Sequence, residues 1–336
     1  MIPVGVGAAL LTALFYGMTP ACARRSIRLL GFARANVWRL VVALVVLGSL
    51  AFTVGRGVGD QAGAFALAGA VGFGLGGFAM FRALPLLGAP LGSLVVETTA
   101  AVVAGVLAWV WFADAVTLPV LGFSAVILAG VVVGLLPYAR GVRRHPRLRL
   151  GIAFAVVAAV AQAFSGVLSR RALLATQQAE KARGTGLRVG ASFEHVFSAA
   201  FDRLVGGVLV AVALLVVAHL LNRRAEWARA SLTPAASAPE RGAVWTPTPD
   251  AALGRLLPDR PWFWVGATAV FGPILGVTSM VWALQTLQPG VAQAIAAMAP
   301  LIAIPAARWL EGYRPPAGYA VGVLVAVLGL AGLALS

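Results

Sequence analysis

The chain has 336 residues, of which 60% are hydrophobic and 11% are charged, and its mean hydropathy is +0.92. A soluble globular protein carries about 25% charged residues, so this composition excludes that class. The formal net charge is +15, which in a soluble protein would favour nucleic acid as a partner. Here the arginines lie mostly between apolar runs, so we expect anionic lipid headgroups, and no nucleic acid, as partners.

Ten apolar runs are long enough to cross a bilayer, whose hydrocarbon core of about 30 Å requires roughly 17–25 helical residues. Backbone groups in lipid must be satisfied within the segment, so the runs are helices and not strands. The sequence therefore predicts an all-α integral membrane protein. The runs lie near residues 2–21, 35–54, 62–81, 88–112, 119–138, 151–169, 203–221, 262–281, 289–310 and 317–335.

An internal repeat relates the two halves of the chain. Within the segment 72–114, residues 72–111 align without a gap with residues 272–311, and Trp109 matches Trp309. The identical positions in the first part of this alignment are Gly72, Leu75, Gly76, Met80, Ala83, Leu84 and Leu87, which match Gly272, Leu275, Gly276, Met280, Ala283, Leu284 and Leu287. The copies differ at Glu97, where the second copy has an alanine followed by two prolines.

The repeat predicts how the chain is divided. Residues 1–138 form a first repeat of five helices, residues 139–150 a basic connecting loop, and residues 151–336 a second repeat of five helices. The polar stretches 171–199 and 222–261 are predicted to be long loops inserted into the second repeat. Because each repeat crosses the membrane an odd number of times, the two repeats are expected to be inverted relative to each other.

Glu97 lies deep within a predicted span. It is about ten residues from the start of its run, and at ~1.5 Å per residue this places it roughly 15 Å deep, near the bilayer midplane. A carboxylate there costs about 2.5–3.5 kcal/mol on insertion scales, and such residues commonly serve transport. Two interpretations are open. Glu97 binds substrate or protons, or it is a structural acid held by Ser93, by Thr98 or by an arginine of another helix.

An arginine opens the second helix of each repeat, with Arg39 in VWRLVVAL and Arg203 in FDRLVGGV. An arginine near a helix end can extend its guanidinium to the headgroups at modest cost. The alternative is that each arginine lines the mouth of a central cavity. Asp202 is the expected ion partner of Arg203, whereas Arg39 has no acidic neighbour in the sequence.

Three glutamines, Gln162, Gln285 and Gln293, lie in or near spans that should face the interior. A non-transporting membrane scaffold needs no polar residues there, so they favour transport. The sequence has no Walker motif, no nucleophile elbow and no His or Cys at metal-ligand spacing. We therefore expect no enzymatic activity, no cofactor and no metal. Coupling would use an ion gradient, with protons as the candidate, or the gradient of the substrate itself.

The sequence resembles the drug/metabolite transporter (DMT) superfamily, and most closely its EamA-type ten-helix transporters. The resemblance rests on the two halves of five helices, the arginine that opens helix two of each half, and the acidic residues Asp114 and Glu311 near the ends of equivalent helices. It covers nearly the whole chain. The sequence departs from the family where Glu97 and Thr98 replace an expected proline, and in its longer loops.

The resemblance implies a secondary transporter that works by alternating access, with a small-molecule substrate in a midplane cavity between the repeats. We expect export of a small organic metabolite, either an amino acid or an amphipathic compound, across the plasma membrane, as in a bacterial inner membrane. The alternatives are a flippase for a lipid or a lipid-linked sugar, and a non-transporting scaffold. The candidate substrate or ion site comprises Glu97, Thr98, Arg39, Arg203, Gln162, Gln285, Gln293 and Trp282.

The orientation in the membrane is open, because two arguments disagree. The loops that follow the odd-numbered spans hold most of the arginines, and the positive-inside rule places such loops in the cytoplasm and both termini outside. The family usually has both termini inside. The charge bias favours termini outside by a small margin.

Overall fold

The computed structural model describes residues 4–112, 117–142, 147–182, 193–230, 260–311 and 318–335. Within these ranges all regular secondary structure is helical. Nine helical segments are long and apolar enough to cross a membrane, and a shorter apolar helix at the C-terminal end makes a tenth. The protein is therefore an all-helical, multi-pass membrane protein, as the sequence predicts.

The first repeat consists of five spans, the third of which is divided into three elements. These are α1 (Val4–Leu30), α2 (Phe32–Thr53), the combination of α3 (Ala62–Gly69), η1 (Ala70–Gly76) and α4 (Gly77–Leu87), α5 (Ala89–Phe112), and α6 (Leu118–Val142). The second repeat follows the same order. It consists of α7 (Leu148–Ala182), α8 (Phe193–Ala230), the combination of α10 (Pro261–Ala269), η2 (Val270–Gly276) and α11 (Val277–Ala283), the pair α12 (Pro289–Ala296) and α13 (Ala299–Glu311), and α14 (Tyr319–Leu335).

The third span of each repeat contains a π-helical segment at the same place. The segments η1 and η2 have seven residues each, and their ends coincide in the sequence alignment of the repeats. In η2, Pro273 has no backbone N–H, so it cannot make a regular helical hydrogen bond. A π-helical segment widens the helix locally and is frequent at functional sites. The matching positions support the repeat that the sequence alignment indicates.

The fourth spans of the two repeats differ at the position of Glu97. In the first repeat α5 runs without interruption past Glu97. In the second repeat α12 ends at Ala296 and α13 begins at Ala299, so the helix is broken beside the equivalent residue, Ala297. Pro300 lies in the first turn of α13, where a missing N–H costs nothing.

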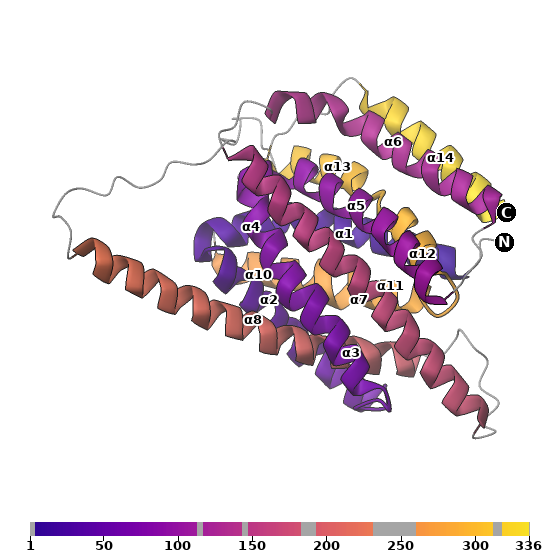
Figure 1. Ribbon diagram of the computed structural model, residues 1–336, viewed down its shortest axis with the longest axis horizontal. Coiled ribbons are helices and arrows are strands. Elements are labelled where there is room, and N and C mark those ends of the chain that lie inside the picture. Colours follow the sequence, from indigo (N-terminus) through magenta and orange to yellow (C-terminus); the bar gives the residue numbers. More distant parts are fainter. Residues whose placement is uncertain are drawn as a thin grey trace.

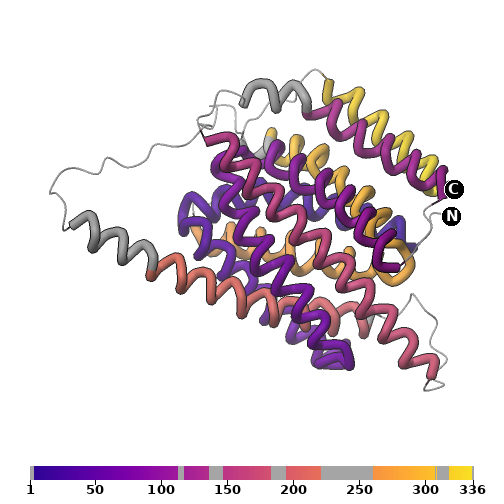
Figure 2. The backbone as a smooth tube through the Cα atoms, viewed as in Figure 1, coloured from indigo at the N-terminus to yellow at the C-terminus, as the bar shows by residue number. Residues whose placement is uncertain are grey.

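The spans alternate in direction, and this defines two faces (Figures 1 and 2). We call the face at which α1 begins and α14 ends the terminal face. The helices α2, α7 and α11 also end at the terminal face, where α3, α8 and α12 begin (Figure 1). The other end of the molecule, the opposite face, carries the connections from α1 to α2 and from α4 to α5. With five spans in each repeat, corresponding helices run in opposite directions.

The two repeats are packed together through close helix contacts. The helices α2 and α3 of the first repeat pack on α8, and α4 and α5 pack on α7. Glycines allow the closest approach, since a Cβ atom on Gly206 would lie 1.8 Å from the Ala66 carbonyl oxygen, and one on Gly69 would lie 1.6 Å from that of Arg203. Small residues at helix interfaces are the usual means of packing in lipid. The pair formed by α6 and α14 lies beside this bundle as an outer layer (Figure 1).

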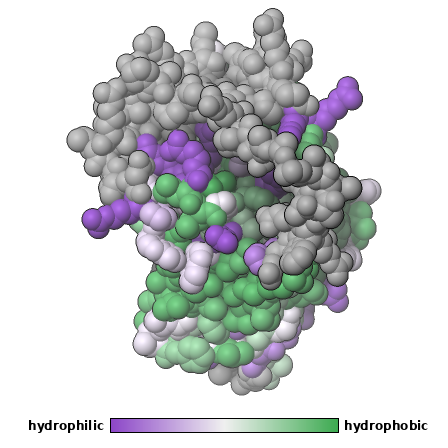
Figure 3. All heavy atoms as spheres, turned by 90° about the vertical axis from the view of Figure 1, so that its left-hand side faces the viewer, coloured by the Kyte–Doolittle hydropathy of each residue, from purple (hydrophilic) through white to green (hydrophobic). Residues whose placement is uncertain are grey.

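Hydrophobic residues cover much of the surface, as a membrane location requires. Figure 3, which looks onto the left-hand side of Figure 1, shows hydrophobic residues over the lower part of this end and hydrophilic residues gathered above them. Large apolar side chains on α5 and α6 are exposed, including Val106, Trp109, Val110 and Leu121. Such an apolar surface is stable only against lipid or another apolar partner.

The helices extend further than the apolar runs suggested, and this corrects three predicted boundaries. The predicted loop at 171–199 is helical at 171–182, where α7 continues, and at 193–199, where α8 begins. The predicted loop at 222–261 is helical up to Ala230, and residues 231–259 lie outside the described part. The predicted connecting loop at 139–150 shortens, because α6 reaches Val142 and α7 starts at Leu148.

Candidate functional site

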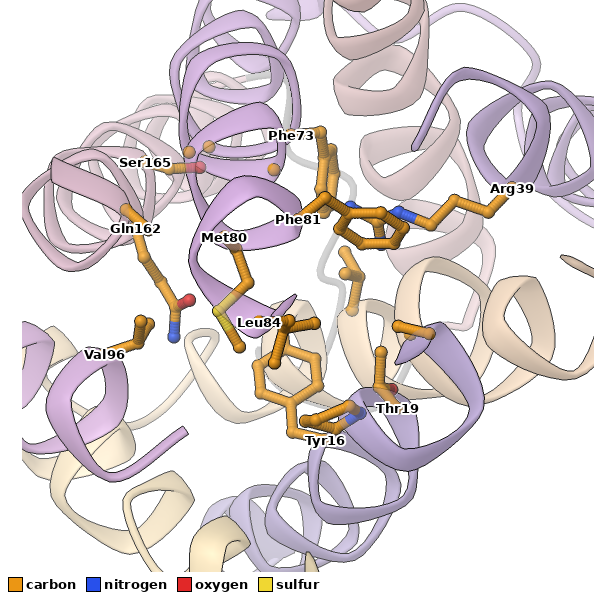
Figure 4. Close-up of a pocket in the computed structure, with 18 of the residues that line it drawn as sticks. Tyr16, Thr19, Arg39, Phe73, Met80, Phe81, Leu84, Val96, Gln162 and Ser165 are labelled. Atoms are coloured by element: carbon orange, nitrogen blue, oxygen red, sulfur yellow. The ribbon is translucent and has the colours of Figure 1, made fainter. Parts of the chain in front are cut away.

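A cavity of about 100 Å³ lies between the two repeats, and we call it the central cavity. Its wall includes charged and polar side chains from both repeats, namely Tyr16, Arg39, Glu97, Gln162, Ser165 and Arg203. The apolar part of the wall includes Phe73, Met80, Phe81, Leu84, Val96 and Val277. Figure 4 shows Arg39 on one side of this cavity and Gln162 with Val96 on the other, with Met80, Phe81 and Leu84 between them.

Arg39 is 7% exposed and is held in place from within its own helix. Its Nε and Nη2 atoms donate to the Oδ1 atom of Asn36, at 3.0 and 2.8 Å. Its guanidinium lies over the ring of Phe81, 4.5 Å from the ring centroid. No hydrogen bond of Nη1 occurs among the described residues. Arg39 therefore does not extend to the headgroups. It is fixed inside the molecule with one end of the guanidinium unpaired.

Arg203, the equivalent arginine of the second repeat, is 5% exposed. Its Nη2 donates to the hydroxyl of Ser165 at 2.9 Å, and that hydroxyl donates to the Ala68 carbonyl at 2.7 Å. Its guanidinium also lies over the ring of Phe73. The Nε and Nη1 atoms have no hydrogen-bond partner in the part of the chain that the structure describes. Burying such donors without partners is costly.

Asp202 does not pair with Arg203, which corrects the prediction from the sequence. Its Oδ2 atom accepts a hydrogen bond from the backbone N–H of Gly59, at 3.1 Å. The side chain of Asp202 lines a different cavity, described below. Adjacent residues on a helix point about 100° apart, so an acid next to an arginine in the sequence is a poor indicator of an ion pair.

Glu97 is 6% exposed and binds two glutamines of the second repeat. Its Oε2 atom accepts a hydrogen bond from Nε2 of Gln162 on α7 at 2.9 Å and another from Nε2 of Gln293 on α12 at 2.8 Å. Its Oε1 atom makes no hydrogen bond with the described residues. Ser93 and Thr98, the hydroxyls suggested by the sequence, instead donate to carbonyls of their own helix.

Tyr16 lies in the wall of the central cavity. It lines this cavity together with Arg39, Glu97 and Arg203. The sequence analysis did not identify Tyr16, Ser165 or Asn36. For Asn36 a signal was present, because it precedes Arg39 by three residues and therefore lies on the same helix face. For Tyr16 and Ser165 a single polar residue in an apolar helix gives no comparable signal.

Three of the candidate residues lie away from the central cavity. Gln285 lies where α11 ends at the terminal face, and its carbonyl accepts hydrogen bonds from Arg170 at 2.8 Å and from Gln177 at 3.4 Å. Trp282 is partly buried against the hydrophobic core. Thr98 is occupied by its bond to the Leu94 carbonyl. The structure thus brings together five of the eight candidates, namely Glu97, Arg39, Arg203, Gln162 and Gln293.

A second cavity of about 290 Å³ lies at the terminal face, and we call it the terminal-face cavity. Arg56, which follows α2, forms ion pairs with Glu180 at the end of α7 and with Glu194 at the start of α8, at 2.7 and 3.2 Å. The Nε2 atom of His195 lies 2.8 Å from Glu180. The ion pairs of Arg56 join the first repeat to the second at this face.

The described residues contain no group of three or more His, Cys, Asp or Glu side chains that could hold a metal ion. The chemistry available in the central cavity is therefore that of two guanidinium groups, a carboxyl group, amides and hydroxyls. These groups can bind a polar or charged ligand, and the carboxyl group can also exchange a proton.

Ten spans in two oppositely oriented sets of five, with a polar cavity between them, define a membrane transporter of the inverted-repeat class. The sequence matches the EamA-like transporter family over residues 3–136 and 243–335, and the chain belongs to that family, within the DMT superfamily. A search of curated proteins gives no significant match. A solved structure described as "Crystal structure of protein" has a TM-score of 0.60 and 18% sequence identity, and the match covers 97% of this chain and 96% of that chain. At this identity the likeness supports the fold alone.

Proposed function

We propose that this protein is a secondary transporter that moves a small organic metabolite by alternating access, with the substrate bound in the central cavity. The observation that carries the proposal is that this cavity lies between the repeats and contains one buried arginine from the equivalent helix of each, Arg39 and Arg203. Buried charges in membrane helices commonly mark substrate or ion pathways. A non-transporting membrane scaffold would not need these buried arginines.

The cavity is closed toward the terminal face. Its lining residues lie mainly in the middle of the spans and in the halves nearer the opposite face, as with Ala23 on α1, Arg39 on α2 and Leu84 on α4. Several contacts lie between the central cavity and the terminal face. They are the ion pairs of Arg56 and the hydrogen bonds that Arg170 and Gln177 donate to Gln285. This arrangement fits a state that loads substrate from the opposite face.

The charge distribution supports one direction of transport. The connections at the opposite face carry most of the arginines, and the positive-inside rule then places that face in the cytoplasm. Loading would occur from the cytoplasm and release at the terminal face, so we propose export, as across a bacterial inner membrane. Glu97 joins α5 to two helices of the other repeat and is the group we propose for proton coupling.

The test begins with a search for binders that covers several chemical classes. Purified protein is melted in the presence of amino acids, organic acids, sugars, sugar phosphates and amphipathic cations, because a ligand that binds the folded state raises the melting temperature. Each binder is then tested for exchange across proteoliposomes. Binding together with exchange is expected for at least one class. A protein that exchanges none of the binders would contradict a transport function.

A disulfide lock separates transport from binding. A Cβ atom on Gly5 of α1 would contact the side chain of Thr286 in the second repeat, so these two neighbouring positions are chosen for a cysteine cross-link. In the variant Gly5→Cys/Thr286→Cys, with Cys22→Ala, oxidation should stop exchange and leave binding intact, and reduction should restore exchange. The single-cysteine variants are the controls. Exchange that continues in the oxidised double variant would rule out alternating access at this face.

A further inference from the structure

The three charged side chains of the central cavity each have an unpaired atom. Arg203 has unpaired Nε and Nη1 atoms. The hydrogen bonds of Arg39 use Nε and Nη2, and those of Glu97 use Oε2, which leaves Nη1 of Arg39 and Oε1 of Glu97 without a partner among the residues that the structure describes. All three side chains are at most 7% exposed. The supporting bonds fix each group, and the unpaired atoms are the ones available to a ligand.

The electric charges of Arg39, Arg203 and Glu97 limit which ligands the central cavity can bind. With Glu97 ionised, the charged residues of the wall comprise two positive groups and one negative group. A buried charge without a partner is strongly unfavourable, so the best ligand supplies one opposite charge for each. An organic cation would be repelled by the two arginines. A phosphate monoester would leave Glu97 without a positive partner. A simple zwitterion would leave one arginine unpaired.

We infer that the substrate is an amino dicarboxylate, a small compound with two carboxylates and one protonated amine. Each carboxylate accepts hydrogen bonds from one guanidinium, because planar carboxylates match the fixed N–H donors of arginine. The ammonium donates to Oε1 of Glu97. The carbon chain contacts the apolar wall formed by Met80, Phe81, Leu84 and Val96. The inference concerns the same cavity and rests on the proposed function.

The spatial separation of the groups agrees with this class. Arg39 lies on the opposite side of the cavity from Gln162, which binds Glu97 (Figure 4). Tyr16 and all three charged groups line this one cavity. A ligand with acidic and basic ends held apart by a short carbon chain can present a charge to each side of the cavity at once.

The test compares matched compounds on the wild-type protein by isothermal titration calorimetry. L-Glutamate and L-aspartate are the probes, L-glutamine replaces one carboxylate by an amide of the same shape, and glutarate lacks the amine. We expect at least one of the two probes to bind, with an affinity tenfold or more above that of L-glutamine and glutarate. Equal affinity for L-glutamate and L-glutamine, or no binding of either probe, would overturn the inference.

Variants assign the two ends of the ligand. Arg203→Gln should abolish the preference for L-glutamate over L-glutamine, and Glu97→Gln should abolish the preference for L-glutamate over glutarate. The matched control is Arg34→Gln, which removes an exposed arginine of α2 outside the cavity and should leave both preferences unchanged. The inference is contradicted if Arg203→Gln still prefers L-glutamate to L-glutamine, or if Glu97→Gln still prefers L-glutamate to glutarate. If a variant does not fold, the titration of the matched compounds on the wild-type protein tests the substrate class by itself.

The two proposals fail in different ways. If another compound class binds and exchanges in proteoliposomes while both probes do not bind, transport stands and the substrate class is wrong. If L-glutamate or L-aspartate binds with the expected preferences but is not exchanged, the binding site stands and the transport function is wrong.

Discussion

Glu97 joins two parts of the molecule through a single oxygen atom. Its Oε2 atom accepts the amide hydrogens of Gln162 and Gln293, which belong to α7 and α12 of the other repeat. A change in the protonation of Glu97 would alter the strength of both bonds, because a hydrogen bond to a charged acceptor is about twice as strong as one to a neutral acceptor. The residue is therefore placed to connect proton binding with the relative position of the repeats.

The substitution Glu97→Gln tests this role. The amide has the shape of the carboxyl group, and its oxygen can accept the same two hydrogen bonds, so the variant should insert into the membrane and melt within a few degrees of the wild type. Transport of a binder should lose its pH dependence. The measurement is exchange in proteoliposomes over a range of pH, with the exposed Glu194→Gln as control. Unchanged pH dependence would refute proton coupling at Glu97, and loss of folding would assign it a structural role.

Close helix contacts at glycine fix the position of α8 against the first repeat. Gly206 faces the Ala66 carbonyl and Gly69 faces the Arg203 carbonyl, so the backbones of α3 and α8 meet directly. Because Gly69 immediately precedes η1 and touches Arg203, this contact also sets the place of Arg203 in the central cavity.

We expect Gly206→Ala to destabilise the protein by about 1–3 kcal/mol, because the added methyl group meets backbone atoms that cannot rotate away. Gly166→Ala on α7 is the matched control, since a Cβ atom there has no atom within 4 Å. Alanine is also the better helix former, so this control should be neutral or slightly stabilising. Thermal melting in detergent compares the two. Equal melting temperatures would mean that α3 and α8 can separate at little cost.

The ends of α7 and α8 close the terminal face through Arg56. Its ion pairs are partly exposed, with the Arg56 side chain 42% exposed, and such pairs contribute about 0.2–1 kcal/mol each. Arg56→Gln should therefore shift the balance toward states open at this face by only a few fold.

That shift can be measured with a cysteine at Ala199, which is buried and lines the terminal-face cavity. In a Cys22→Ala background, the rate at which a maleimide labels Ala199→Cys should rise roughly two- to fivefold when Arg56→Gln is added. Arg34→Gln, which removes a charge at the opposite face, should leave the rate unchanged. A rate that Arg56→Gln does not alter would show that other contacts hold this face closed.

At the scale of the whole molecule, the orientation in the membrane determines the direction of transport. Helix α1 begins and helix α14 ends at the terminal face (Figure 1), and the parts of the sequence that join span ends at the opposite face contain most of the arginines. If the opposite face is cytoplasmic, the central cavity loads from the cell interior.

A cysteine at Ser336, with Cys22→Ala, decides the orientation. An impermeant maleimide added to intact cells should label it, because the charge distribution places the terminal face outside. Permeabilised cells give the total that can be labelled. Labelling only after permeabilisation would place the termini inside, reverse the proposed loading side and favour import over export for the state seen here.

The sequence by itself determined the class of fold and identified the charged residues within the spans. The ten apolar runs, the repeat and the positions of Arg39, Glu97 and Arg203 follow from hydropathy and periodicity, because lipid enforces helices of nearly fixed length. The sequence could not determine where helices end outside the lipid. The stretch 171–182 is polar, but it is rich in good helix formers such as Ala, Leu, Gln and Glu, so α7 continues through it.

Only the tertiary structure decided which side chains meet. Gln162 is 65 residues from Glu97 in the sequence and Gln293 is 196 residues away, yet both bind the same carboxylate oxygen. Asp202, next to Arg203 in the sequence, points to a different cavity. Spacing along a helix gives the face on which a residue lies, but the pairing of faces between inverted repeats depends on how the helices pack. For that reason the charged groups were predictable one by one, and the site they form was not.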